Sequence, residues 1–513
     1  MTDSQDTNES LRPQHEDKLQ KQQEQECAQE AENSKFNITD KQLRMGTGNI
    51  FSLICIFGGP AILSQLVQVS YNLVDTIFVG QATGEHGLAA INLILPAVLV
   101  FIALAAWIAV GAAPLFSTRM GEKDYPGAAR LLGSTVSINA LFSIAVGLIC
   151  LIFSEPIIRL SGATEELVPD ASAYLMIYGG FFIGINLGYT INGFISACGS
   201  PGRALMTQVV AALSNIVLDW LFVIHWNMGV AGAAWATVIA WGLGLCAAAQ
   251  FFFSKKSPFK LQVSDFKPDF TGFRKVLSYG FPVFAMQIGY AITMVILLAV
   301  VVDIGNHSWM GAEGALAAIN VISRGYNIIL IPSIGITSGC ISLLAYNMGA
   351  QHYARVRKIF WNSFYISLLA TFVLWIPVLI FSAQLMNLFG ISTELTEYGA
   401  QLMRLQTCMA PIVVFEVAVG ELFIALGRSK AGAILQIMRS LVVVCILYVS
   451  FPYILPNYLP IQAFTALVAA EPVADIILLG ISIALTIPLF KTIKDFELKK
   501  ISDEKALVSG QEA

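Results

Sequence analysis

Long apolar segments recur along almost the whole length of the chain. Each is at least about 20 residues long, which is enough for an α-helix to cross the ~30 Å hydrocarbon core of a bilayer. This pattern predicts an all-α polytopic membrane protein. Twelve transmembrane helices are predicted, at residues 50–81, 88–118, 127–153, 170–198, 203–225, 230–254, 274–304, 314–346, 354–380, 395–425, 432–453 and 462–490.

The composition agrees with a membrane protein and excludes several other classes. Only 12% of the 513 residues are charged, against about a quarter in a soluble protein. The first 45 residues hold 10 acidic and 6 basic residues, and so account for the whole net charge of −4. The remainder is neutral, which excludes a nucleic-acid-binding protein, because such a protein needs a basic face. Its high apolar content also excludes a disordered scaffold.

The basic residues lie almost entirely in alternate connections between the spans. Lys and Arg are retained on the cytoplasmic side of a membrane, so their distribution predicts the orientation. One side carries 20 basic residues, whereas Arg159 stands alone on the other. We therefore expect a multi-pass protein of the cell (inner) membrane with both termini cytoplasmic. Residues 1–45, rich in Gln and Glu, are predicted to form a disordered cytoplasmic tail.

An internal repeat divides the chain into two halves. The segment Leu88–Asn92 recurs unchanged as Leu316–Asn320, an offset of 228 residues that also relates Gly111 to Gly339. Each half contains six spans, so both halves have the same orientation, and a pseudo-twofold axis must run along the membrane normal. Binding is expected near mid-membrane, in a cleft between the halves. The predicted domains are the tail (1–45), an N-lobe (46–254), a linker (255–275), a C-lobe (276–490) and a second cytoplasmic tail (491–513).

Polar side chains cluster on one face of the first predicted span. Gln65, Gln68, Asn72 and Asp75 follow at spacings of 3, 4 and 3 residues, which places them on one side of a helix. Tyr71 borders this stripe. Pro60 lies earlier in the same span and is expected to bend the helix, because it removes a backbone hydrogen bond.

The fifth and sixth predicted spans carry a second polar group. Asn215 and Asp219 are one turn apart, Gln208 lies two turns before Asn215, and Thr237 supplies a hydroxyl in the next span. A carboxylate in a low-dielectric environment takes up a proton readily, and carboxylate, amide and hydroxyl oxygens are the hard ligands that sodium prefers. The residues therefore predict a proton site or a sodium site. The alternative is that both aspartates lie at helix ends or bond neighbouring helices.

The second half does not repeat these aspartates. At the corresponding positions it has Leu297 and Leu447. Its charges have mixed signs, which favours internal ion pairs between helices over a substrate role. Ion binding is thus predicted only in the first half. The charged residues in or near the spans of the second half are Arg324, Arg404, Glu416, Glu421, Arg439, Glu471 and Asp475.

Several stretches resemble the multidrug and toxic compound extrusion (MATE) family, in particular its bacterial DinF- and MepA-like branch. They are NLVDTIFVGQ (72–81), LAAIN (88–92), GAAPLFSTRMGEKD (111–124), and NGFISACGSPGRA through SNIVLDWLFV to GVAGAAWATVIA (192–240). The resemblance spans roughly residues 46–490. It implies a V-shaped pair of helical bundles and cation-coupled export of cationic or amphipathic organic compounds.

The resemblance also implies roles for individual residues. Asp75, Asn215, Asp219 and Thr237 match the family's cation site in the amino-terminal lobe, so a sodium ion at these four residues is one expectation. The substrate cavity is expected to involve Pro60, Gln65, Gln68, Tyr71, Asn72 and Gln208. Two positions depart from the family pattern. Trp220 replaces a common Pro, and Gln287 stands nearest to an acidic residue of the NorM-like branch, which argues against a NorM-type sodium site in the carboxy-terminal lobe.

The leading hypothesis is therefore a secondary active exporter that exchanges a proton or sodium for its substrate by alternating access. Neither a P-loop nor a CxxC pair is present, so an enzyme, a zinc site and a cofactor other than H⁺ or Na⁺ are not expected. Expected partners are small organic cations or amphipathic drugs and the lipid bilayer, and a monomer is expected. One alternative is a flippase for a lipid-linked precursor, or a small-metabolite exporter, of the same superfamily. Another is a channel.

Overall fold

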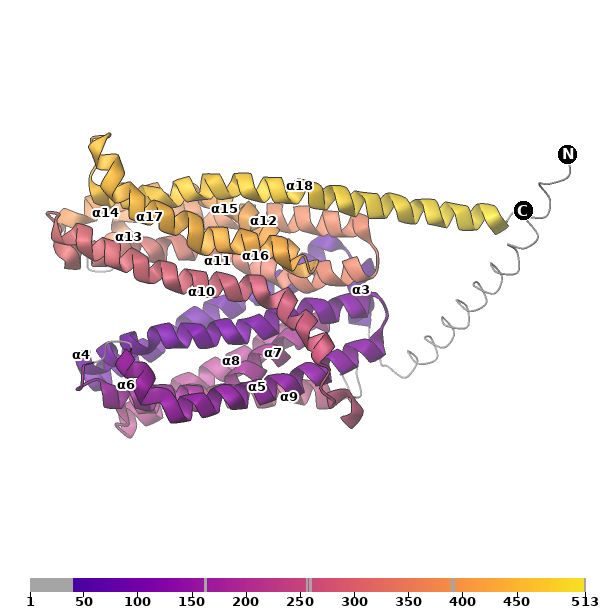
Figure 1. Ribbon diagram of the computed structural model, residues 1–513, viewed down its shortest axis with the longest axis horizontal. Helices are drawn as coiled ribbons and strands as arrows, with labels where there is room; N and C mark the ends of the chain where they lie inside the picture. The colour runs from indigo at the N-terminus through magenta and orange to yellow at the C-terminus, as the bar shows by residue number, and fades with distance from the viewer. Residues whose placement is uncertain (1–39, 161–163, 255–256, 258–260, 389–392, 512–513) are drawn as a thin grey trace.

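The computed structural model describes residues 40–511 except 161–163, 255–256, 258–260 and 389–392 (Figure 1). The described residues form helices joined by short turns and contain no strand. Ten helices are long and apolar enough to span a membrane, and two bent helix pairs bring the number to twelve. The all-α prediction is confirmed.

The helices follow the predicted spans in order. They are α3 (Asp40–Thr47), α4 (Ile50–Gly121), α5 (Tyr125–Leu160), α6 (Val168–Gly180), α7 (Phe182–Ala197), α8 (Pro201–Asp219), η1 (Trp220–His225), α9 (Gly229–Phe253), η2 (Val263–Phe266), α10 (Phe270–Asn306), α11 (Gly311–Gly349), α12 (Tyr353–Ile380), α13 (Ser382–Leu388), α14 (Thr393–Thr407), α15 (Ala410–Ala425), α16 (Ser429–Ile437), η3 (Met438–Val442), α17 (Val443–Ile454), η4 (Leu455–Asn457) and α18 (Ala463–Gln511).

Helix α4 contains the first two spans. The chain reverses at Gly84, whose φ of 63° lies in the left-handed region that glycine adopts without a steric penalty. The backbone stays helical through Pro60, because Gly84 is the one residue of α4 with non-helical dihedral angles. The expected effect of Pro60 is therefore not a break in the helix.

The fourth and tenth spans are both broken, at equivalent points of the repeat. Helices α6 and α7 meet at 46° around Phe181, and α14 and α15 meet at 42° before Ala410. Breaking a helix leaves backbone carbonyls without partners in a region that water does not reach freely. In the second half, the indole Nε1 of Trp375 donates to the carbonyl of Thr407 at 2.7 Å and satisfies one of them.

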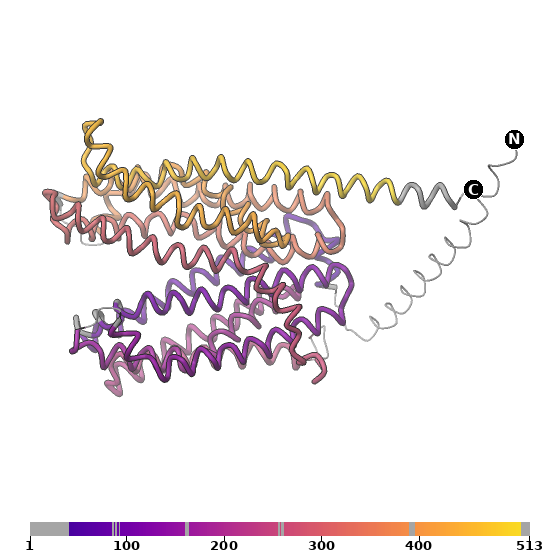
Figure 2. The backbone as a smooth tube through the Cα atoms, in the orientation of Figure 1, coloured from indigo at the N-terminus to yellow at the C-terminus, as the bar shows by residue number. Residues whose placement is uncertain are grey.

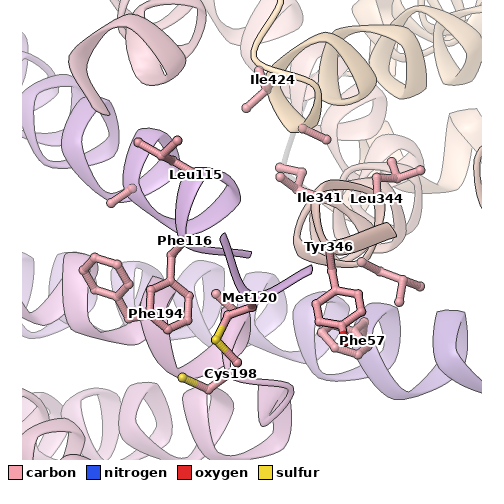
Figure 3. Close-up of a cluster of buried hydrophobic side chains, with 14 of the residues drawn as sticks. Phe57, Leu115, Phe116, Met120, Phe194, Cys198, Ile341, Leu344, Tyr346 and Ile424 are labelled. Carbon is pink, nitrogen blue, oxygen red and sulfur yellow. The ribbon is translucent and has the colours of Figure 1, made fainter. Parts of the chain in front are cut away.

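Two groups of helices share one hydrophobic core at one end and have separate cores at the other. Figures 1 and 2 show α4 to α9 in indigo to pink as one group and α10 to α18 in rose to yellow as the other. One buried cluster joins Phe116 and Phe194 of the first group to Leu344 and Tyr346 of the second (Figure 3). Two further clusters each lie within a single group, around Val79 and Tyr174 or around Val301 and Phe464. The shared cluster lies beside the α4–α5 and α11–α12 turns, which the sequence marks as basic. We call this the basic end.

The two groups approach each other through glycines. A Cβ at Gly280 of α10 would lie 1.8 Å from the backbone oxygen of Trp107 in α4, and one at Gly111 would lie 2.1 Å from that of Val276. The pseudo-symmetric contact repeats this geometry, since a Cβ at Gly339 of α11 would lie 2.6 Å from the oxygen of Phe57. Only residues without a side chain allow backbones to come this close. Helix α4 therefore crosses both α10 and α11 at glycine contacts.

Both ends of the described chain pack at the basic end. Predicted tail residues 1–39 lie outside the described residues, whereas residues 40–45 begin α3, so the helical structure starts earlier than expected. Met45 of α3 is 1% exposed, and its carbonyl accepts a hydrogen bond from Asn347 at 3.0 Å. Helix α18 continues past the predicted end of its span at residue 490, and its Glu497 pairs with Arg357 at 2.9 Å.

Candidate functional site

A small polar cavity lies between α4, α7, α8 and α9 of the first group. Its volume is about 20 Å³, which is enough for one water-sized occupant. Four of the predicted substrate or cation residues line it: Gln68 and Tyr71 of α4, and Gln208 and Asn215 of α8. The other lining residues are Ser64, Val67, Tyr189, Ala211, Ala212, Ala240 and Trp241.

Two aromatic residues that the sequence analysis did not select form one wall of this cavity. Tyr189 of α7 and Trp241 of α9 stack with ring centroids 4.6 Å apart. The Nε2 of Gln68 donates to the hydroxyl of Tyr189 at 3.2 Å, which ties the polar stripe of α4 to this wall. Aromatic residues in apolar spans usually pack against lipid or other helices, so no sequence signal separates these two from the other aromatic residues.

Asp219 is the last residue of α8 and is fully buried, at 0% exposure. Among the described residues, neither of its carboxylate oxygens has a hydrogen-bond partner, and the same is true of Oδ1 of Asp75. The two carboxylates lie close enough to interact electrostatically, and the buried Tyr174 interacts with both. The structure thus brings together the two aspartates that the sequence placed on different spans.

The backbone changes its winding directly after Asp219. Residues Trp220–His225 form the π-helix η1, and one-turn π-segments inside α-helices occur frequently at functional sites. This explains how Trp220 can stand where relatives often have proline. A π-helical segment interrupts the regular i→i−4 ladder without needing a residue that lacks an N–H.

Asn215 completes the polar group. It is 3% exposed, and within the described part of the chain both its amide oxygen and its amide nitrogen are unpartnered, as is Oε1 of Gln208. A buried polar atom without a partner costs about 1–3 kcal/mol. Carboxylate and amide oxygens that share this deficit are suited to hold a proton or a hard cation such as sodium.

Other predicted residues lie outside this arrangement. Thr237 is half-buried on α9, and no contact links it to the aspartates. Pro60 and Gln65 are half-buried on α4 and Asn72 is exposed; none of the three is among the described lining residues of the cavity. Asn72 therefore points away from the buried face that its spacing with Asp75 suggested.

The family model MatE matches residues 60–221 and 282–449, so it covers both halves of the repeat. The chain belongs to the MatE family. Family members are membrane transporters, so the chain is a transporter and not an enzyme. The two matched segments each begin at the proline of a half's first span, Pro60 or Pro282, as expected for a duplicated unit.

Curated relatives within the family are about one-quarter identical to the chain. The multidrug export protein MepA of Staphylococcus saprophyticus subsp. saprophyticus is 23% identical over 408 residues, covering 78% of this chain and 87% of that protein. MepA of Staphylococcus aureus is 24% identical with the same coverage.

Solved structures of the family share the fold. One, described as the outward-facing conformation of a multidrug resistance MATE family transporter of the MOP superfamily, has a TM-score of 0.82 and 22% identity, covering 90% of this chain and all 100% of that one. A MOP superfamily transporter from Pyrococcus furiosus, whose description says that reverse polarity of its binding pocket suggests a different function, has a TM-score of 0.79 and 22% identity and covers 89% of this chain and 99% of its own.

The charges of the second half are not balanced in the way the mixed signs suggested. Arg404 donates to the carbonyl of Leu379 at 3.1 Å and to the hydroxyl of Ser382 at 2.8 Å, and so pairs with no printed acid. Arg439 lies 3.9 Å from Glu416, at the outer limit of an ion pair. The expected network of internal ion pairs is thus reduced to this one loose contact among the described spans of the second half.

Proposed function

We propose that this chain is a secondary active exporter of cationic or amphipathic organic compounds, driven by proton or sodium antiport. The observation that carries the proposal is the pair of buried, unpartnered carboxylates of Asp219 and Asp75 in the first lobe. Intramembrane carboxylates are costly unless they bind an ion or a proton, and are functional by default. The named activity of the MepA relatives supports the direction and breadth of transport.

The arrangement of the lobes supports an alternating-access cycle. The lobes share a core at the basic end and have separate cores at the other end. With the basic end cytoplasmic, as the positive-inside rule predicts, this is the conformation closed toward the cytoplasm. The protein would then lie in the cell inner membrane with both termini cytoplasmic, and act as a monomer.

Helix α4 connects the ion site to the closure of the lobes. It carries Asp75 in its first span and makes the glycine contacts with α10 and α11 through Gly111 and Gly58. An ion can drive export only to the extent that it binds the two lobe arrangements differently. We infer that neutralising Asp75 and Asp219 changes the packing of α4 and thereby favours one lobe arrangement over the other.

The cavity wall suits an organic cation. Tyr71, Tyr189 and Trp241 present aromatic rings beside the polar atoms of Gln68 and Asn215. Aromatic faces attract cations by about 0.5–2 kcal/mol, and more when water is excluded. Apolar and aromatic walls with few polar groups also accept many shapes, which fits a multidrug substrate range.

The decisive experiment is efflux of a fluorescent organic cation from proteoliposomes under an imposed pH gradient, first without and then with sodium. Asp219→Asn and Asp75→Asn should abolish gradient-driven efflux, because neither amide can exchange a proton or balance a cation. Asp495→Asn, an exposed change at the cytoplasmic end of α18, is the matched control. Efflux at the wild-type rate in both cavity variants would refute the site. A response to sodium alone would assign sodium as the coupling ion.

The flippase alternative receives little support from the second lobe. A pyrophosphate headgroup needs free cationic groups, yet Arg404 is engaged by Leu379 and Ser382, and Arg439 faces Glu416. The polar atoms of the first-lobe cavity come from Gln, Asn, Ser, Tyr and Trp side chains. A cavity without a basic residue favours cations over anions.

A further inference from the structure

The second lobe contains its own buried acidic cluster, built from three elements. Glu416 and Glu421 lie on α15, Arg439 lies on η3, and Glu471 and Asp475 lie one turn apart on α18. Four carboxylates therefore gather around one guanidinium, and α15, η3 and α18 pack against one another. This is the densest group of ionisable side chains inside the described spans of this lobe that the first-lobe mechanism does not use.

Two of these carboxylates lack partners although they are almost fully buried. The Glu416 side chain is 0% exposed, and neither carboxylate oxygen has a hydrogen-bond partner in the described structure. Its Oε2 lies 3.9 Å from Nε of Arg439, which is beyond hydrogen-bonding distance. Asp475 is 3% exposed, and its Oδ2 is likewise unpartnered.

The neighbours on every packed helix are acids or neutral groups apart from Arg439. Asp475 interacts electrostatically with Glu471, Glu416 and Arg439, and Glu471 accepts a hydrogen bond from the Tyr448 hydroxyl at 2.5 Å. The titratable groups that face the cluster are Tyr290 of α10, Tyr326 of α11, Cys408 before α15, Glu416 and Glu421 of α15, Arg439 of η3, Tyr448 of α17, and Glu471 and Asp475 of α18.

This charge balance cannot be maintained with all four acids ionised. Placing several uncompensated carboxylates in a low-dielectric interior is far more costly than protonating them. A metal ion is not the counter-charge, because no three acidic, His or Cys side chains of the described residues converge as metal ligands. A proton is the cation that needs neither a cavity nor a coordination shell.

We propose that Glu416, Glu471 and Asp475 form a second proton-binding site, in the second lobe, that is loaded and unloaded during the transport cycle. The proposal rests on the antiport function above and extends it. It also replaces the expectation that ion binding is confined to the first lobe. The ligand is a proton, and Arg439 is the group whose distance from Glu416 sets how readily that proton is held.

The surroundings of Arg439 connect this site to the movement of the lobes. The guanidinium is 23% exposed and sits in a π-helical turn, so it retains freedom to move toward or away from Glu416. The hydroxyl of Thr293 on α10 donates to the carbonyl of Ser440, the next residue of that turn, at 2.5 Å. Helix α10 is also the helix that crosses α4 at Gly280. A shift of α10 against α4 therefore reaches Arg439 through one hydrogen bond.

Infrared spectroscopy of the purified full-length protein tests the site directly, because a protonated carboxyl has a carbonyl band that an ionised one lacks. Wild type should show this band at neutral pH. Glu416→Gln and Asp475→Asn should each reduce it, and Arg439→Gln should enlarge it, since removal of the cation favours protonation. Glu313→Gln, at an exposed acid of α11, should leave it unchanged. An unchanged band in all three cluster variants would overturn the proposal, and the opposite sign expected for Arg439→Gln separates titration from loss of fold.

The role in transport is tested by the ratio of protons released to organic cation bound, measured in weakly buffered solution with tetraphenylphosphonium. Glu416→Gln/Asp475→Asn should release fewer protons per bound cation than wild type. The same ratio as wild type would show that the cluster holds its protons permanently, and would overturn its role in the cycle. Asp75→Asn/Asp219→Asn should keep the infrared contribution of the cluster. Wild-type efflux by this last variant would refute the first-lobe site without touching the second.

Discussion

The substitution Gly280→Ala should push the lobes apart at the basic end. A Cβ at this position would lie 1.8 Å from the backbone oxygen of Trp107, whereas real Cβ atoms do not come closer than 3.0 Å. The backbones of α4 and α10 must therefore separate by about 1.2 Å, the difference between these values. Neither atom belongs to a flexible side chain, so rotamer changes cannot relieve the clash.

The energetic effect follows from this geometry. Inserting a methyl group into a close-packed contact typically costs about 1–3 kcal/mol. The clash exists only where α4 and α10 touch, so its cost falls on the conformation closed at the basic end. The ratio of closed to open molecules should then fall by about 5- to 150-fold, since about 1.4 kcal/mol corresponds to a factor of ten. Gly59→Ala on α4 is the matched control, because a Cβ there meets nothing within 4 Å.

Pulsed electron paramagnetic resonance can measure the shift. Spin labels at Arg130→Cys and Lys358→Cys, two exposed and repeat-related sites near the basic end, report the separation of α5 and α12 after Cys55 and Cys246 are replaced by Ser. Gly280→Ala should add a longer distance that Gly59→Ala does not. Unchanged distances together with a lowered melting temperature would refute the reasoning, since the clash would then destabilise the fold and not one conformation.

Three further predictions concern other parts of the molecule. Trp241→Ala should weaken binding of tetraphenylphosphonium by about 3- to 30-fold in a fluorescence titration, as expected for loss of one cation–π contact, whereas Trp241→Phe should keep most of the affinity. Met45→Ala, at a residue 1% exposed in α3, should lower the unfolding free energy by about 2 kcal/mol in a thermal unfolding assay, and an unchanged midpoint would show that α3 is not packed as described. Burial, together with Lys500 and Arg355, lowers the pKa of His352, so the fold disfavours its protonated form and stability is lost as the pH falls below the ordinary value of 6.5; His352→Gln should therefore lose less stability than wild type between neutral pH and about pH 5, and an equal loss would contradict the argument.

The number and order of the spans could be predicted because span length is set by the bilayer. An apolar run either reaches across the hydrocarbon core or does not, and no tertiary contact changes that requirement. Residues 470–511 show the limit of this logic. Once α18 leaves the membrane it continues as a helix by packing Glu497 against Arg357, a contact between residues far apart in the chain. Residues 40–45 were missed for the same reason, because α3 is held by Met45 and Asn347 and not by its own composition.

The aspartates of the site could be predicted because a carboxylate in an apolar run is conspicuous. Their aromatic wall could not, since Tyr189 and Trp241 look like any other ring in a membrane helix. The π-helical turn after Asp219 was also invisible, because its cause is the packing of η1 against α9 and not its own sequence. In the second half, the sequence supplied the signs of the charges but not their grouping. Arg404 turned out to bond a carbonyl and a hydroxyl, which left Arg439 facing four acids.

The repeat gives both halves the same mechanical contacts but different chemistry. Gly111 against α10 and Gly339 against α11 are related by the offset of 228 residues, so each lobe grips the other in the same way. The ionisable groups are not so related, because Asp219 corresponds to Leu447 and Glu416 to Gly188. A proton bound at Asp75 acts on α4 itself, whereas one bound at Glu416 acts on α10 only through Arg439, Ser440 and Thr293. If both sites load in one cycle, cutting the second route with Thr293→Val should remove the contribution of the second lobe to the number of protons released and leave that of Asp75 and Asp219 in place.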